Sequence, residues 1–283
     1  MPSLTEPAAD GRLTPTAAPS GRAVVARPVA GPRPPSEWGG LAGLLLPAMA
    51  LALWEALARA GVLPPNWLPA PSAVVRTVGE LARSGELVGH LSATLLRVGA
   101  GFALGAAVAT VLAVACGTSP VLRALLDPTL QALRNIPSMA WIPLFLLWLG
   151  IAETSKIALI ALGAFFPVYL GLLQGILHID VRLVEVGRVC GYRGVALARR
   201  VLLPAALPPY LAGLRGGLGL AWMFVVAAEL MGASRGLGFL MVDGQSSSRA
   251  DLILASLSLF AALGKATDSL LVAVASRLQP GRG

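Results

Sequence analysis

Residues 157–177 have the sequence IALIALGAFFPVYLGLLQGIL and contain no charged side chain. An apolar stretch of about 20 residues is long enough to cross a bilayer as one helix. Pro137 and Pro143 predict that one of the other apolar stretches is kinked or interrupted. The sequence therefore predicts an all-α polytopic membrane protein with six transmembrane helices. The six predicted spans lie near 40–57, 95–115, 136–149, 157–177, 205–228 and 252–275.

The composition agrees with a protein that lives mostly in lipid. Of the 283 residues, 56% are hydrophobic and 13% are charged, with a mean hydropathy of +0.75. About a quarter of the residues of a typical soluble domain are charged. The net charge of +8 would suggest nucleic acid in a soluble protein. No long Lys/Arg run and no basic patch with interleaved aromatic residues is present, so we expect membrane lipid and no nucleic acid as a partner.

The positions of the basic residues predict an orientation. With both termini in the cytoplasm, the predicted inside segments hold thirteen Arg and the outside segments hold six Arg or Lys, in the direction of the positive-inside rule. The inside residues are Arg12, Arg22, Arg27, Arg33, Arg123, Arg134, Arg182, Arg188, Arg193, Arg199, Arg200, Arg277 and Arg282, and the outside ones are Arg59, Arg76, Arg83, Lys156, Arg235 and Arg249. Cys116 and Cys190 then lie on the reducing side and match no metal or redox spacing.

Six polar side chains are candidates for a translocation path or for structural pairs inside the bundle: Arg97, Asn135, Arg215, Glu229, Lys265 and Asp268. Such groups are unfavourable in lipid and should face protein or water. Lys265 and Asp268 are three positions apart on one helix and can pair. Arg97 and Glu229 lie near the ends of spans, so we expect them to reach toward the interface. Arg215 lies inside its span and is the best candidate to meet an anion, with helix packing as the alternative.

The sequence contains no recognisable catalytic set. Gly264-Lys265-Ala266 lacks the upstream Gly and the hydroxyl of a phosphate-binding loop, so the chain is not expected to bind ATP in that way. The two His, His90 and His178, are far apart in sequence and form no H-E-x-x-H zinc site, and no G-x-S-x-G motif occurs. We therefore expect no catalytic residue, no metal site and no bound cofactor.

Residues 178–204 form the largest polar insert between two predicted spans. The pattern predicts a short helix, a turn at Gly191, a second basic helix, and Pro204 at the start of the next span. A helix that projects from the charged side of a bundle suits the docking of a partner. A solvated loop with no partner is the alternative.

This insert resembles the EAA loop of the permease subunits of bacterial ABC importers. The matching positions are Glu185, Gly191, Val201, Leu203 and Pro204, at the family spacing. Val186 and Gly187 depart from the usual Ala-Ala, and Val201 replaces a usual Ile. Further segments are similar to the aliphatic sulfonate, taurine and nitrate branch of these permeases, and to the sulfonate permeases above all, over about 40–276. They are 133–137 (LRNIP), 142–144 (IPL), 147–151 (LWLGI), 163–167 (GAFFP) and 263–265 (LGK).

The resemblance implies the type I importer fold in the bacterial inner membrane. It also implies a homodimer, with two cytoplasmic ATPase subunits docked on the loop at 178–204 and an extracytoplasmic substrate-binding protein on the opposite face. ATP and Mg would be used by the ATPase, and the permease would alternate between inward- and outward-facing states. The implied substrate is a small anion, foremost an aliphatic sulfonate, with taurine, nitrate or a pyrimidine precursor as alternatives. An ATP-independent secondary transporter, with Glu229 and Asp268 as proton-carrying groups, is the more distant alternative.

The ends of the chain lie outside the predicted membrane domain at 38–276. Residues 1–37 are rich in Pro and show no apolar periodicity, which predicts a disordered cytoplasmic tail that is not a signal peptide. Because the resemblance does not cover this tail, a start codon assigned too far upstream is one explanation. We expect deletion of residues 2–30 to leave transport intact. Residues 277–283 are expected to be a short second tail.

Overall fold

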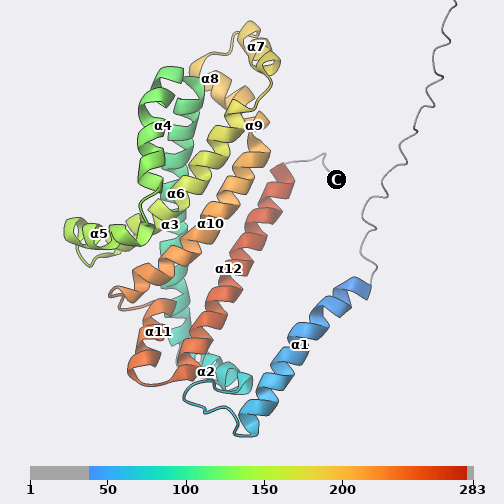
Figure 1. Cartoon of the computed structure of the whole chain (residues 1–283), viewed down its shortest axis with the longest axis vertical. Helices are drawn as coiled ribbons and strands as arrows, with labels where there is room; N and C mark the ends of the chain where they lie inside the picture. Colours follow the sequence, from blue (N-terminus) through green and yellow to red (C-terminus); the bar gives the residue numbers. More distant parts are fainter. Residues whose placement is uncertain (1–37, 279–283) are drawn as a thin grey trace, which may run out of the picture. The chain divides into compact units, whose positions relative to one another are not determined.

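The computed structural model describes residues 38–278, and within this range every regular element is a helix. The predicted tail at 1–37 and residues 279–283 lie outside the described residues. The chain divides into two compact units after Ala48, within α1 (Trp38–Arg59), and the second unit begins at Met49. The remaining elements of this second unit, drawn in Figure 1, are α2 (Pro71–Ser84), α3 (Glu86–Thr118), α4 (Pro120–Arg134), η1 (Ser138–Trp141), α5 (Ile142–Leu149), α6 (Glu153–Leu177), α7 (Val181–Val189), α8 (Gly194–Leu197), η2 (Ala198–Leu202), α9 (Leu203–Ala205), α10 (Leu207–Leu230), α11 (Leu237–Ser246) and α12 (Ala250–Leu278).

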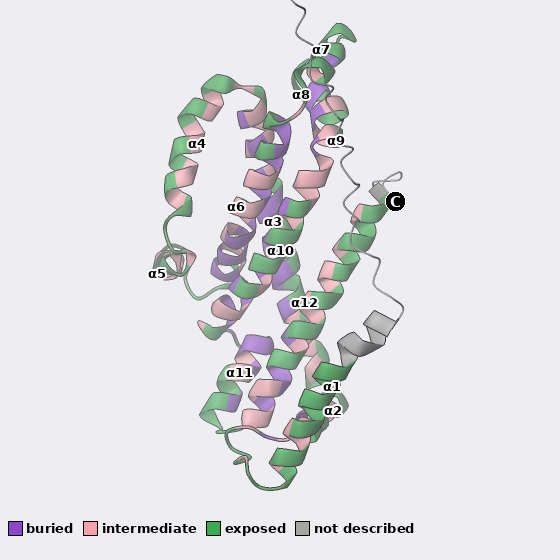
Figure 2. Cartoon of the chain, turned by 45° about the vertical axis from the view of Figure 1, so that its right-hand side comes forward, coloured by how far each residue is buried: buried purple, intermediate pink, exposed green. Residues whose placement is uncertain are grey.

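The centre of this unit is a layer of three long helices, with α6 packed between α3 and α10. Small residues allow the close approach. At Gly105 of α3, a side-chain carbon would overlap the carbonyl oxygen of Ala161 of α6. On the other side of α6, Gly171 faces Gly213 of α10 in the same way. The α6 helix is accordingly the most buried of the long helices, as its colouring in Figure 2 shows.

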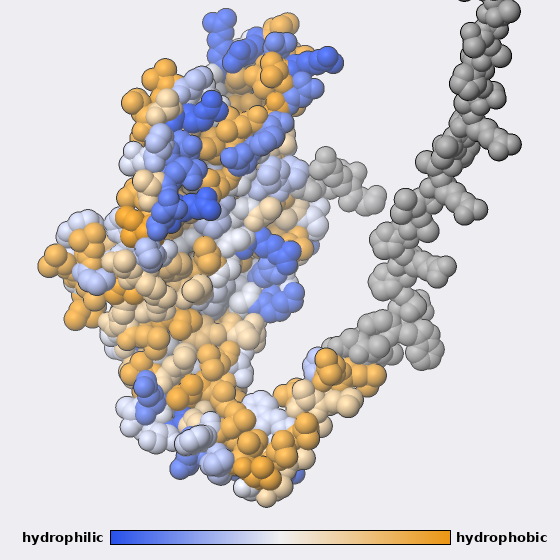
Figure 3. All heavy atoms as spheres, in the orientation of Figure 1, coloured by the Kyte–Doolittle hydropathy of each residue, from blue (hydrophilic) through white to orange (hydrophobic). Residues whose placement is uncertain are grey.

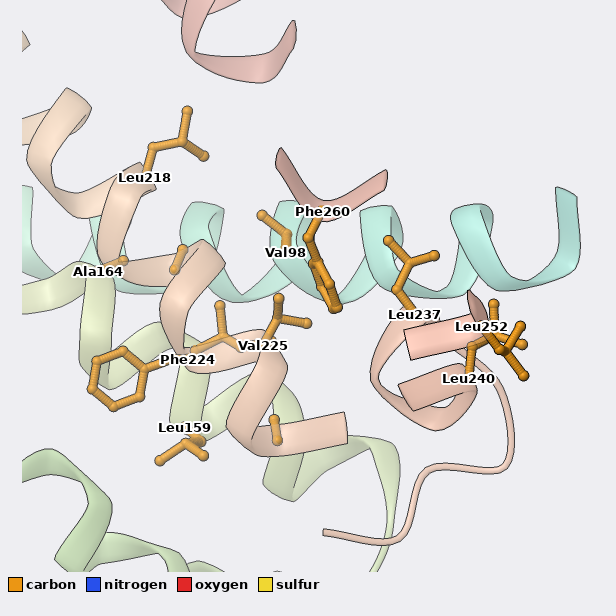
Figure 4. Close-up of a cluster of buried hydrophobic side chains, with 13 residues drawn as sticks. Val98, Leu159, Ala164, Leu218, Phe224, Val225, Leu237, Leu240, Leu252 and Phe260 are labelled. Atoms are coloured by element: carbon orange, nitrogen blue, oxygen red, sulfur yellow. The ribbon is translucent and has the colours of Figure 1, made fainter. Parts of the chain in front are cut away.

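Two apolar clusters fill this layer, one toward each end of α6. The first includes Val98, Leu159, Phe224 and Leu237 and joins α3, α6 and α10 to α11 and α12 (Figure 4). The second includes Tyr169 and Leu202 and extends from α6 to the short helices that follow it. Each cluster therefore holds one end of the helix layer, and each end carries a group of polar residues.

Among the described residues, four helices are long and apolar enough to cross a membrane, namely α3, α6, α10 and α12. They coincide with the predicted spans near 95–115, 157–177, 205–228 and 252–275, and α3 and α12 extend well beyond the predicted limits. The α10 helix begins at Leu207, and Pro204 lies in the preceding α9. Pro204 therefore does not start the span, and Pro208 occupies the first turn of α10 instead.

The predicted span at 136–149 is interrupted, as Pro137 and Pro143 indicate, and it is not one continuous helix. The segment is a short 3₁₀ turn followed by the eight-residue α5, and it makes an angle of 96° with α4. Pro137 separates the two arms, as the expected interruption requires. The α4 helix packs beside α3 (Figure 1), so Arg123 and Arg134, which the charge count places inside, lie on a helix. The bent pair would be a fifth crossing or a re-entrant segment.

Candidate functional site

The polar insert at 178–204 folds into a chain of short helices, α7 to α9, between the end of α6 and the start of α10. We call residues 178–205 the coupling segment. Figure 3 shows hydrophilic side chains gathered over this end of the molecule. Asp180 is the N-cap residue of α7, and its side chain accepts a hydrogen bond from the amide of Arg182 at 2.9 Å. Glu185 and Val186 lie exposed on this helix. A partner can therefore reach both side chains.

Gly191 ends α7 and turns the chain, as the sequence predicts. Its φ is +84°, a left-handed conformation that favours glycine. The amide of Tyr192 donates to the carbonyl of Gly187 at 3.0 Å, and that of Gly191 donates to the carbonyl of Arg188 at 2.9 Å. This pair of bonds is a Schellman motif. No described atom lies within 4 Å of the place where a Gly191 side chain would begin, so the backbone angle alone sets the requirement for glycine.

The other family positions of the segment lie on the side of α7 that packs against η2 and in the helices that follow it. Gly187 is buried, and a side-chain carbon there would come within 2.9 Å of Val201 and 3.0 Å of Leu197. The departure from Ala at position 187 thus lets α7 pack closely on the π-helical turn η2. Leu203 is half-buried and Pro204 is exposed. Glu185, Val186 and Gly191 face outward, while Gly187 and Val201 fix the angle between the helices.

A second polar group lies at the opposite end of α6 and α10, about 35 Å away along a helix of this length. It is centred on Arg97 of α3, which is only 5% exposed. The Arg97 guanidinium pairs with Glu153 through Nε and Nη2 at 2.6 and 2.8 Å, and donates through Nη1 to Glu229 at 2.8 Å and to the carbonyl of Arg235 at 2.6 Å. Lys156 also pairs with Glu153, at 3.0 Å. We call Arg97, Glu153, Lys156 and Glu229 the Arg97 cluster.

The expectation that Arg97 and Glu229 reach toward the interface is wrong. Glu229 is 1% exposed and has a partner for each oxygen. Thr94 donates to Oε1 at 2.8 Å, and the amide of Gly238 donates to Oε2 at 2.7 Å. A buried carboxylate needs such complete hydrogen bonding. The cluster therefore joins α3, α6, α10 and the start of α11, with Arg97, Lys156 and Glu229 buried and Glu153 about half exposed.

Sequence reasoning missed several members of this group, among them Thr94, Glu153 and Lys156. Glu153 and Lys156 are three positions apart in the first turn of α6, just before an uncharged span. An acid at a helix N-terminus followed by a base on the same face is the signal that could have identified them. Their pairing with Arg97, 56 positions earlier, depends on the tertiary fold.

A third polar group lies in the middle of α10 and α12. Arg215 donates to Asp268 through Nε at 2.6 Å and Nη2 at 2.9 Å. The predicted partner Lys265 is 4.0 Å from the same carboxylate, so Asp268 pairs mainly with Arg215. The Arg215 and Lys265 side chains are 57% and 77% exposed. Figure 3 shows hydrophilic side chains on the surface over the middle of α12.

The remaining candidate, Asn135, belongs to none of these three groups. It follows α4 as its C-cap residue, is exposed, and its side chain makes no hydrogen bond among the described residues. Its backbone amide donates to the carbonyl of Ala132 at 3.1 Å. Within the described residues, Asn135 therefore marks the bend between α4 and α5.

Long apolar helices, a projecting polar segment at one end and charges in the middle of two spans are typical of a membrane transport permease. The family described as the inner membrane component of binding-protein-dependent transport systems matches residues 94–280. The chain belongs to this family. Like the other members of the family, it is a transport permease subunit of the ABC type and not an enzyme.

Three relatives illustrate the similarity. A Bacillus subtilis protein named as an aliphatic sulfonates transport permease is 45% identical over 233 residues, which are 82% of this chain and 84% of its own length. The taurine transport system permease protein of Escherichia coli is 34% identical over 241 residues, 83% of this chain and 88% of its own. The nitrate import permease protein of a Synechocystis strain is 34% identical over 191 residues, 68% of this chain and 70% of its own.

Proposed function

We propose that this chain imports small organic anions, aliphatic sulfonates foremost, as a homodimer driven by two cytoplasmic ATPase subunits. A substrate-binding protein delivers the anion to the extracytoplasmic end. The observation that carries the proposal is the coupling segment, a rigidly turned helix with exposed Glu185 and Val186 at one end of the bundle. The ATPase binds ATP and Mg, and the permease contributes no catalytic residue and holds no cofactor.

The coupling segment suits the transmission of force. Its first helix is fixed by the Gly191 turn and by the packing of Gly187 on Val201. The guanidinium of Arg200 lies 4.9 Å from the centre of the Tyr192 ring and donates to its hydroxyl at 3.1 Å, which ties the second half of the segment to the turn. Movement of a docked ATPase would therefore move α7 to α9 together with the adjoining ends of α6 and α10.

The Arg97 cluster completes this mechanism at the other end. It fixes α3, α6, α10 and the start of α11 to one another through ion pairs and hydrogen bonds centred on the buried Arg97 and Glu229. Helices joined in this way move as one body, so a tilt imposed at the coupling segment opens or closes the far end. In this proposal the cluster is a structural brace, and Arg97 and Glu229 do not contact the substrate.

For the topology, we propose six crossings with both termini in the cytoplasm. The coupling segment carries Arg182, Arg188, Arg193, Arg199 and Arg200, which favours the cytoplasm for that end. The α12 helix runs toward the same end (Figure 1), in agreement with a cytoplasmic C-terminus. The four long spans, the bent pair α4–α5 and α1 supply the six crossings.

The test is uptake into proteoliposomes that contain the permease, its ATPase and its binding protein. We expect ATP-dependent uptake of a labelled alkanesulfonate, faster than that of taurine or nitrate. An ATPase with a mutated phosphate-binding loop should abolish it. Preferred uptake of taurine, nitrate or a pyrimidine precursor would overturn the choice of substrate. Uptake that persists with the mutated ATPase would instead indicate a secondary transporter.

A further inference from the structure

The charged residues in the middle of α10 and α12 lie at a depth where lipid cannot surround them. Lys265 is the sixteenth residue of the 29-residue α12. It is therefore about 20 Å from either end of the helix, and the hydrocarbon core is about 30 Å thick. An exposed ammonium at this depth requires water or protein beside it.

One positive charge of this group is not neutralised within the described chain. Asp268 takes two hydrogen bonds from Arg215, and its distance of 4.0 Å to Lys265 is too long for a hydrogen bond. Two cations and one carboxylate leave one positive charge per chain. The donors that remain are Lys265 Nζ and Arg215 Nη1, neither of which has a hydrogen-bond partner among the described residues.

An apolar groove begins beside one of these donors, Arg215. It encloses about 400 Å³ between the first half of α10 and the last turns of α12. Arg215 lies at one end, and the walls come mainly from Leu211, Ala212, Leu271 and Val272. A cationic donor next to an apolar groove matches a ligand with an anionic head and an alkyl tail.

We infer that Lys265, with Arg215 beside it, binds the anionic head of the substrate during translocation, and that the groove holds the alkyl tail. This inference rests on the proposed function and deepens it, since it assigns the substrate class to chain-bearing sulfonates. The three sulfonate oxygens accept hydrogen bonds from Lys265 Nζ and Arg215 Nη1. Asp268 is a positioning residue, because its two bonds hold Arg215 at the end of the groove.

The subsite discriminates among the anions that the relatives are named for. Nitrate has no tail to occupy the groove. Taurine would place its ammonium group against apolar walls, where a charge is unfavourable. An alkanesulfonate satisfies both parts, and each additional methylene removes more apolar surface from water.

The experiment measures ATP-driven uptake of labelled ethanesulfonate and octanesulfonate by the full complex in proteoliposomes. Lys265→Gln should slow the uptake of both anions about tenfold, because a charge-assisted hydrogen bond is lost, and Lys265→Arg should restore most of it. The matched control is Arg76→Gln, which removes an exposed cation of α2 and should change neither rate.

A second pair of variants tests the groove separately. Ala212→Phe should fill it and slow the uptake of octanesulfonate about tenfold, but that of ethanesulfonate less than about twofold. Ala273→Phe adds the same ring at an exposed position of α12 outside the groove and should slow neither.

The outcomes separate this inference from the function on which it rests. Wild-type rates in Lys265→Gln would overturn the head-group site. Equal slowing of both anions by Ala212→Phe, or dissociation of the permease dimer, would show that a second copy fills the groove. Failure of the wild-type complex to import any alkanesulfonate would overturn the proposed function, and the subsite with it.

Discussion

Nη1 of Arg97 lies 2.8 Å from Oε1 of Glu229, so a salt bridge buried in the bundle joins α3 to α10 across 132 positions of sequence. Taking both charges out of water is unfavourable, and only complete pairing offsets the penalty. Glu153, Thr94 and Gly238 supply the remaining partners. The pair therefore requires all of these helices to be in place together.

Removing the charge of Arg97 should destabilise the permease, because the buried carboxylate of Glu229 then loses its charged partner. Arg97→Met leaves Glu229 as an uncompensated buried charge, so we expect a loss of about 3–5 kcal/mol in the free energy of unfolding. The measurement is the thermal unfolding midpoint of the detergent-solubilised permease. Arg76→Met, at an exposed position, is the control and should leave the midpoint unchanged.

The double variant Arg97→Met/Glu229→Gln makes this test specific. Because a neutral amide is easier to bury than a carboxylate, the combined loss should be smaller than the sum of the two single losses. Strictly additive losses would mean that the two charges do not interact in the folded permease.

The contact between α3 and α6 gives a second prediction. Gly105→Ala should lower the unfolding midpoint, since the new methyl group overlaps the backbone of Ala161 and forces the helices apart. Gly99→Ala on the same helix meets no atom within 4 Å and should be neutral or stabilising by up to about 1 kcal/mol. Equal effects of the two changes would be inconsistent with close packing at Gly105.

The position of α4 gives a third prediction, which concerns a single hydroxyl. The buried Tyr169 of α6 donates a hydrogen bond to Asp127 of α4 at 3.0 Å. Tyr169→Phe should destabilise the permease by about 1.5–3 kcal/mol, because the lost bond is to a charged group. Tyr210→Phe removes a neutral bond to Thr110 at 2.9 Å and should cost about 0.5–1.5 kcal/mol. The opposite order in chemical denaturation would argue against α4 docking on α6 through Asp127.

The sequence predicted the parts of this fold that depend on local pattern. Residues 157–177 predict a transmembrane helix by themselves, because an uncharged apolar stretch of that length can cross a bilayer as a helix. Gly191 is similar, since a glycine at the end of a short helix predicts the left-handed turn that is observed. Such features need no information about distant residues.

The parts that failed depend on the tertiary fold. The position of Arg97 near the end of a span predicted an exposed side chain. In the fold, Arg97 pairs with Glu153 and Glu229 and is buried. Pro137 predicted an interruption, yet the 96° turn into α5 could not be derived from it. Lys265 and Asp268 are neighbours on one helix, and Arg215 from another helix displaced Lys265 as the partner.

The central claim is that an ATPase acts on this permease through the coupling segment, and Gly191→Asp tests it most directly. Gly85 is the matched control, because its φ of +80° is nearly that of Gly191 and no described atom lies within 4 Å of the first side-chain carbon at either position. Gly85 lies between α2 and α3, at the end remote from the coupling segment. The measurement is ATP-driven alkanesulfonate uptake in proteoliposomes with equal amounts of permease. We predict that Gly191→Asp abolishes uptake while Gly85→Asp retains most of it; wild-type uptake by Gly191→Asp, or an equal loss in both variants, would contradict the claim.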